Sequence, residues 1–214
     1  LWLKRGFFVL VISIAVLGIG YTIQHKISQA AAVVSTQTGD WHTSSTWGGG
    51  PIPAVGDVVT VSSGHTVTFT SDIAAVADIN VSGILVQDNA NTQTISGDLT
   101  ILSGGELTHS DNSTTQTYIL DFTADNIDVQ SGGTVDVDEK GYDGGQSKTV
   151  NSGSGYGPGP GLLVDGFDDV GSGGGHGGNG GDNTYWGGVA GGTAYCNIGN
   201  IATMGSGGGG SGWG

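Results

Sequence analysis

One short pattern occurs four times in the middle of the chain and limits the folds that the chain can adopt. Each copy has a run of alternating apolar and polar residues, a corner of serine and glycine, and a second alternating run. The first glycines of these corners are Gly64, Gly83, Gly104 and Gly132, which puts steps of 19, 21 and 28 residues between copies. Repeats of this length are typical of solenoids, in which each unit buries its apolar face only by stacking on its neighbours.

The repeat predicts a right-handed parallel β-helix over residues 57–140, within an all-β fold. Stacked coils would pair every strand with those above and below it, at a spacing of about 4.8 Å. Val, Ile and Leu would then face inward, whereas Thr, Ser, Asn and Asp would face water. Glycine at the corner would supply a turn with positive φ. The alternative is a sandwich of hairpins, but the strand pairs lack the two-residue Asn-Gly or Asp-Gly turns that favour one.

The first 32 residues have the composition of a signal peptide or a membrane anchor. Lys4 and Arg5 precede an apolar-leaning run, residues 7–23, that is expected to be helical. The alanines at 30–32 offer a small-residue cleavage site, after which the mature chain would begin at Val33. Without cleavage, residues 7–23 would reach the lower length limit for a membrane span. Both interpretations predict an extracellular or cell-surface location.

The remaining segments flank the predicted coils. Residues 33–56 are expected to form a linker and an N-terminal cap, and residues 141–214 a glycine-rich, mostly irregular insertion. Of the 44 glycines in the chain, 29 lie in that insertion. The sequence stops inside a Gly/Ser run, so we expect the insertion to be truncated. Aromatic residues recur through it and indicate that it packs against something.

Charge separates the leader from the rest of the chain. The chain has 19 acidic and 5 basic residues, and beyond residue 32 the only basic ones are Lys140 and Lys148. An acidic surface of this kind repels phosphate backbones, so nucleic acid is excluded as a partner. Arginine is absent beyond the leader, which argues against a lyase that acts on an acidic polysaccharide. The sequence predicts no catalytic residue and no cofactor-binding residue.

Calcium is the one ligand for which the residues offer candidates. The densest carboxylate group lies where the coils end, at Asp136, Asp138, Glu139 and Asp143. It partly matches a calcium loop of the D-x-D-x-x-G kind, although Lys140 stands at a ligand position. A solvated strand edge and turn explains the same residues equally simply.

A second, weaker candidate is Asp182. It lies in residues 177–185, which are close to the calcium-binding nonapeptide G-G-x-G-x-D-x-U-x, with Thr184 in place of the large apolar residue. No tandem copy follows nine residues later, and chance matches are common in a stretch so rich in glycine.

Two stretches resemble known families. Residues 41–69, which contain STWGGG and GDVVTVSSGHTVTF, resemble the opening of G8-type bacterial surface β-helix domains. Residues 141–214 resemble the glycine-rich insertions of large secreted bacterial β-helix proteins, in which further coils follow. The resemblance implies a secreted or surface protein with adhesion or carbohydrate contact as its role.

A third resemblance concerns the leader. Lys4-Arg5-Gly6-Phe7 before an apolar run resembles the leader junction of type IV pilins, which normally have a glutamate at the fifth mature position. That position is Val11 here.

Three hypotheses of function follow. The first is an exported structural or adhesive cell-surface protein that contacts polysaccharide. The second is the N-terminal part of a polysaccharide-degrading β-helix enzyme, and the third is a pilin-like filament subunit. Two or more carboxylates that converge in a groove would favour the enzyme, whereas a flat outward ladder of Thr, Ser and Asn would favour the first hypothesis.

Overall fold

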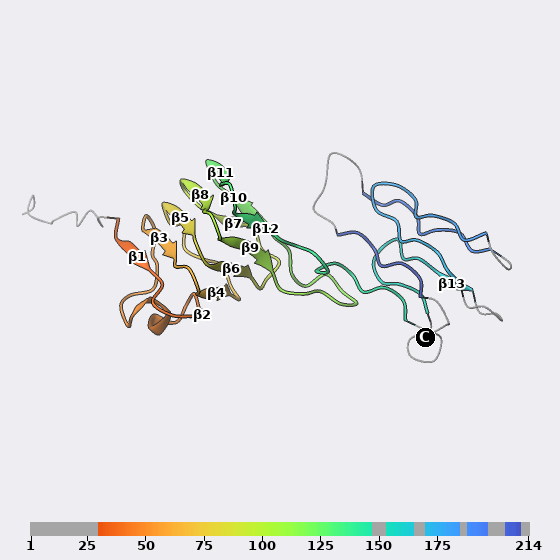
Figure 1. The fold of residues 1–214 in the computed structure, drawn as a ribbon, viewed down its shortest axis with the longest axis horizontal. Helices are drawn as coiled ribbons and strands as arrows, with labels where there is room; N and C mark the ends of the chain where they lie inside the picture. Colours follow the sequence, from red (N-terminus) through yellow and green to blue (C-terminus); the bar gives the residue numbers. More distant parts are fainter. Residues whose placement is uncertain (1–29, 147–152, 165–169, 185–187, 197–203, 211–214) are drawn as a thin grey trace, which may run out of the picture.

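A computed structural model describes residues 30–146, 153–164, 170–184, 188–196 and 204–210 (Figure 1). The apolar run 7–23 and its predicted helix lie outside these residues. Within them, no helix is long and apolar enough to cross a membrane. The one helix described is a 3-10 helix, η1, at Ser44–Trp47, so the described chain is almost entirely β-structure and irregular segments.

Two five-stranded parallel sheets dominate the structure. The first has the order β1 (Ala32–Val34), β3 (Val58–Val61), β5 (Asp78–Val81), β8 (Asp98–Ile101) and β11 (Asn126–Val129). The second has the order β2 (Gly39–Asp40), β4 (Thr66–Phe69), β6 (Ile84–Gln87), β9 (Glu106–His109) and β12 (Thr134–Val135). Two short pairs accompany them: β7 (Gln93–Thr94) with β10 (Phe122–Thr123), which is parallel, and β13 (Leu163–Val164) with β14 (Val170–Gly171), which is antiparallel.

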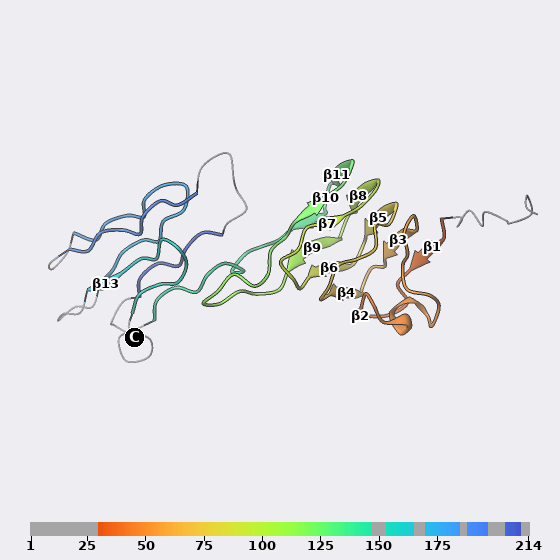
Figure 2. The ribbon, with the colours of Figure 1, turned by 180° about the vertical axis from the view of Figure 1, so that it is seen from behind.

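The chain passes back and forth between the two large sheets. Strands β3 and β4 flank one Ser-Gly corner, yet β3 pairs with β5 and β4 pairs with β6, in both cases parallel. The layers therefore follow one another along the length of the molecule, as Figures 1 and 2 show from opposite sides. Because the strands on either side of a corner do not pair, the hairpin sandwich is wrong and the predicted all-β, parallel arrangement is confirmed.

The pairing register stacks apolar side chains into ladders inside the layers. Val59, Ile79 and Leu99 lie at matching positions of the first sheet, and Val67 and Leu85 lie at matching positions of the second. All five have no exposed surface. The alternating pattern buries every second residue of β3 to β6, because successive side chains of a strand point to opposite faces. The predicted inward Val, Ile and Leu residues are confirmed for β3 to β6.

The corner glycines serve two different purposes. Gly64 and Gly104 have φ values of 80° and 79°, so they supply the positive-φ turn that the sequence predicts. Gly83 has no positive φ; instead, a Cβ there would overlap the carbonyl oxygens of Ser62 and His65. That corner requires glycine because the backbone of the preceding layer passes too close for a side chain.

The stack begins earlier than the sequence predicts. Strands β1 and β2 lie in or beside the segment expected to be a linker and cap, and they pair with β3 and β4. Trp41 covers the start of the core, with its ring edge-on to Trp47 at 5.1 Å and to Phe69 at 6.3 Å. The indole Nε1 of Trp47 donates to the carbonyl of Trp41 at 2.7 Å, which fixes η1 on this end.

The other end of the stack exposes apolar residues. Ile127 and Val129 of β11 are 53% and 45% exposed, and Val135 of β12 is 44% exposed. Residues at the same register in the preceding layer, Leu99 and Ile101, are fully buried. The last layer thus has apolar residues at the positions that face the core in earlier layers, but these residues are much more exposed.

The glycine-rich region beyond β12 is held by backbone hydrogen bonds. Segment 205–210 is bonded to four other segments through Gly145, Gly153, Gly161 and Ser172. A β-strand pairs with two neighbours at most, since its N–H and C=O groups point to two opposite sides. These extended segments are therefore bundled rather than arranged in one sheet, which explains why most of them have no regular secondary structure.

Glycine is what allows this bundle to be so dense. Among the described residues of this bundle, the buried ones are Ser172 and seven glycines: Gly153, Gly155, Gly159, Gly161, Gly175, Gly192 and Gly207. A Cβ on Gly155 or Gly207 would overlap backbone atoms of a neighbouring segment. The predicted irregular character is confirmed, but the region is packed and bonded in the way collagen packs glycine at its axis.

Asn112 joins the stack to the glycine-rich region. It is 3% exposed, and its Nδ2 donates to the carbonyls of Tyr118 and Lys140 and contacts the Met204 sulfur. Its Oδ1 accepts from the N–H groups of Thr117 and Tyr118. Beside it, the Ser113 hydroxyl donates to Asp143 at 2.8 Å.

Candidate functional site

The calcium candidates lie in turns and at the junction rather than in one cluster. The Asp136 carboxylate accepts from the backbone N–H of Asp138 at 2.9 Å, and Glu139 follows with a φ of 59°. Asp143 accepts from the Ser113 hydroxyl, and Asp182 accepts from the N–H of Gly191 at 2.8 Å. Across the described ranges, no three His, Cys, Asp or Glu side chains are placed to hold one metal ion. Calcium binding stays a prediction. In the structure, Asp136, Asp143 and Asp182 each accept a hydrogen bond from another group of the protein.

A strip of polar side chains runs along the side of the stack on which β7 and β10 lie. Its residues come from four layers. Its members are polar and largely solvent-accessible, and each comes from a turn or strand end: Asp40, His42, Asp72, Asn91, Thr92 and Asp121. We call this set the polar strip. It is a feature that sequence reasoning missed, because the four turns that supply its members are about 20 to 30 residues apart and follow no motif.

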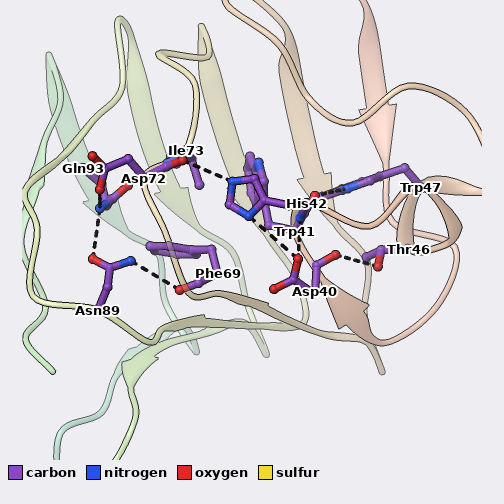
Figure 3. Close-up of polar contacts among 10 residues, drawn as sticks. All are labelled: Asp40, Trp41, His42, Thr46, Trp47, Phe69, Asp72, Ile73, Asn89 and Gln93. Carbon is purple, nitrogen blue, oxygen red and sulfur yellow. Dashed lines mark hydrogen bonds and ion pairs between the residues drawn. The ribbon is translucent and has the colours of Figure 1, made fainter. Parts of the chain in front are cut away.

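His42 stands at the N-terminal end of the polar strip (Figure 3). Its Nε2 lies 3.1 Å from the carbonyl oxygen of Asp72, and its Nδ1 lies 3.8 Å from a carboxylate oxygen of Asp40. A carbonyl can only accept, so Nε2 carries the proton in this arrangement. Nδ1 then faces a carboxylate oxygen of Asp40. At about one-third exposure, a contact between these two groups is worth at most about 1 kcal/mol.

Each further carboxylate of the polar strip has its own donor. Asp72 accepts from the Asn91 amide at 2.7 Å, and Asp121 accepts from the Thr92 hydroxyl at 2.7 Å. Asp72 and Asp121 lie two layers apart, and their donors Asn91 and Thr92 come from the layer between them. The polar strip offers a row of hydrogen-bonding groups.

Two buried glutamines hold the turns that carry the polar strip. Gln93 is 1% exposed; its Oε1 accepts from the N–H of Ile73 and its Nε2 donates to Asn89, as Figure 3 shows for the residues around it. Gln87 has no exposed surface; it donates to the carbonyl of Asn91 and accepts from the N–H of Asp121. Both buried amides have donors and acceptors bonded, to backbone groups and to the Asn89 side chain, so they fix the turns that carry Asp72 and Asp121.

The outward face of the first large sheet carries a second polar row. Thr60, Asn80 and Thr100 lie at matching positions of β3, β5 and β8, and Asp128 follows on β11. The first three are partly exposed and Asp128 is exposed. We call these four residues the outer ladder. Three of its four members are the Thr and Asn residues expected to face water.

Ser35 and His65 also form a close pair, with the hydroxyl 2.9 Å from Nδ1. Ser35 is 2% exposed and its oxygen also accepts from the N–H of Ser62 at 2.8 Å. A hydroxyl so buried and so occupied joins layers and is out of reach of a substrate, so it does not serve as a nucleophile.

Comparison with known protein families gives one result. Residues 46–142 match the model of the G8 domain. The match begins in η1 and ends just beyond β12, and it confirms the G8-like resemblance seen in the opening segment. Neither curated proteins nor solved structures gave a significant match. Asp72 and the outer ladder lie within the matched residues, whereas Asp40 and His42 precede them.

Proposed function

We propose that the protein is an exported structural or adhesive protein of the cell surface, and that its stack is a right-handed parallel β-helix that contacts polysaccharide. The alternation between two parallel sheets supports the β-helix. Connections between parallel strands of one sheet are right-handed in about 98% of cases, which supports the handedness. The strongly apolar run at residues 7–23, preceded by Lys4 and Arg5, supports export.

The outer ladder is the observation that carries the proposal. Its hydroxyl and amide groups repeat at the spacing of adjacent strands, about 4.8 Å. Such groups donate and accept hydrogen bonds as sugar hydroxyls do, and they require no ordering because the strands hold them. Rigid, flat and polar surfaces of this kind suit binding along a chain better than bond cleavage.

Replacement of the ladder tests this role. The triple variant Thr60→Val, Asn80→Leu, Thr100→Val keeps side-chain volume but removes the hydrogen-bonding groups. We expect co-sedimentation with insoluble cell-surface polysaccharide to fall at least tenfold, while Thr66→Val on the outward face of the second sheet leaves it unchanged. Equal binding by the triple variant and the parent would refute the role of the ladder.

A polysaccharide-degrading enzyme is the second candidate, and His42 is the observation in its favour. The ring lies between Asp40 and Asp72 on an accessible edge, where it could transfer a proton. Release of reducing ends from neutral polysaccharides, lost in His42→Ala, would support this candidate. Absence of any release by the parent protein would reject it.

A further inference from the structure

Ala31 is part of the folded stack. Its N–H donates to the carboxylate oxygen Oδ1 of Asp57 at 2.9 Å, and its carbonyl accepts from the N–H of Val58 at 2.9 Å. The next residue, Ala32, begins β1 and pairs with Val58. Cleavage after Ala32, as the alanine motif alone predicts, would remove both hydrogen bonds and the first residue of the strand.

Asp57 is placed to receive a positive charge. It is 7% exposed, and its second oxygen, Oδ2, accepts from the N–H of Ala54 at 2.9 Å. Buried carboxylates are normally paired with a cation. Among the described residues, Lys140 is the one lysine or arginine, and it lies beyond the last strand of the stack. The contact between His42 and Asp40 lies at the other sheet.

We propose that the export leader is removed between Ala30 and Ala31, and that the new α-ammonium group of Ala31 pairs with Asp57. Hydrolysis breaks the Ala30–Ala31 peptide bond: water leaves its oxygen on the Ala30 carboxylate, and the Ala31 amine is protonated. The amide donor already beside Asp57 thereby becomes a charged one, and charge-assisted hydrogen bonds are about twice as strong as neutral ones. This inference rests on the proposed export.

The sequence around the bond fits such a cut. Cleavage sites of export signals carry small residues at the first and third positions before the bond, which are Ala30 and Ser28 here. Ala30 and Ala31 are both exposed. The cut at Ala30–Ala31 keeps every residue that pairs with β3, whereas the cut after Ala32 does not.

The N-terminus of the exported protein tests the proposal directly. Intact mass and N-terminal sequencing of the protein recovered from the cell surface or medium should give a chain that starts at Ala31. A start at Val33, at any other residue, or with the leader retained would overturn the cleavage proposal while export stands. Failure of the protein to leave the cytoplasm would overturn export itself, and this inference with it.

A second measurement separates the ion pair from a merely structural role of Asp57. In the mature protein, the pKa of the Ala31 α-amino group should lie above its usual range of about 7.7–8.0, because the carboxylate stabilises the charged form. Asp57→Asn should return it to that range. Asp78→Asn is the matched control, since Asp78 also accepts a backbone N–H, from Asp98 at 2.9 Å, and should leave the amine unchanged. An unshifted amine in the parent would refute the pair.

Discussion

The dense packing of the glycine-rich bundle can be tested by adding one methyl group at Gly207. Gly207 is buried, its N–H donates to the carbonyl of Tyr156 at 2.9 Å, and its carbonyl accepts from Gly161 at 2.9 Å. A Cβ at this position would overlap the carbonyl oxygen of Asp143. Two residues away, Gly205 is exposed and has no atom within 4 Å of where its Cβ would lie. Gly207→Ala and Gly205→Ala are therefore a matched pair.

The expected difference follows from the contacts. Overpacking by one methyl costs about 1–3 kcal/mol, and each backbone hydrogen bond that is pushed apart costs about 0.5–1.5 kcal/mol more. With its two hydrogen bonds, Gly207→Ala should thus destabilise the bundle by about 2–6 kcal/mol. Gly205→Ala should stabilise it by about 0.4–1 kcal/mol, because alanine restricts the unfolded chain and meets no obstacle here.

Amide hydrogen exchange followed by mass spectrometry measures this effect locally. Peptides that cover residues 141–146 and 204–210 should exchange at least tenfold faster in Gly207→Ala, since each 1.4 kcal/mol is a factor of ten. Peptides from β5 and β6 should be unaffected. Equal exchange in Gly207→Ala and Gly205→Ala would refute the view that backbone contact, rather than side-chain packing, holds this region.

Three further outcomes are expected. Leu99→Ala should lower the free energy of unfolding by about 2–5 kcal/mol, measured by denaturant titration, because the side chain is fully buried; the exposed Leu162→Ala should change it by less than about 0.5 kcal/mol. Trp47→Phe should cost about 1–3 kcal/mol in the same assay, since the carbonyl of Trp41 loses its indole donor. Asn112→Ala should raise the proteolysis rate between the stack and the glycine-rich region at least tenfold, and an unchanged rate would contradict its joining role.

The stack was predictable because its information is local and repeated. Alternation in each strand fixed which residues face inward, and the corner glycines fixed where the chain turns. Gly83 follows a serine, as Gly64 does, but it has a different backbone conformation. Glycine is required there because the backbone of the preceding layer leaves no room for a Cβ, whereas Gly64 supplies a turn with positive φ. Such a close approach is a tertiary property that the sequence around Gly83 does not express.

The polar strip and the glycine-rich bundle were beyond the reach of sequence patterns for related reasons. His42 meets Asp72 only because one layer lies on the next, and 30 residues separate them. Glycine content predicts an irregular chain, but it carries no signal for which segment bonds to which. The carboxylates Asp136 and Asp143 are near in sequence, yet the first accepts from the N–H of Asp138 and the second from the Ser113 hydroxyl, and their spacing does not express this difference.

The pairing partners of β3 and β5 test the stacked arrangement most directly. Nuclear Overhauser effects between backbone protons of isotope-labelled protein distinguish the partners of a strand without reference to side chains. We predict contacts that join Asn80 to Thr60 and to Thr100, in parallel register, and none between β3 and β4. Antiparallel contacts between β3 and β4, or between β5 and β6, would contradict the stack and return the chain to a sandwich of hairpins.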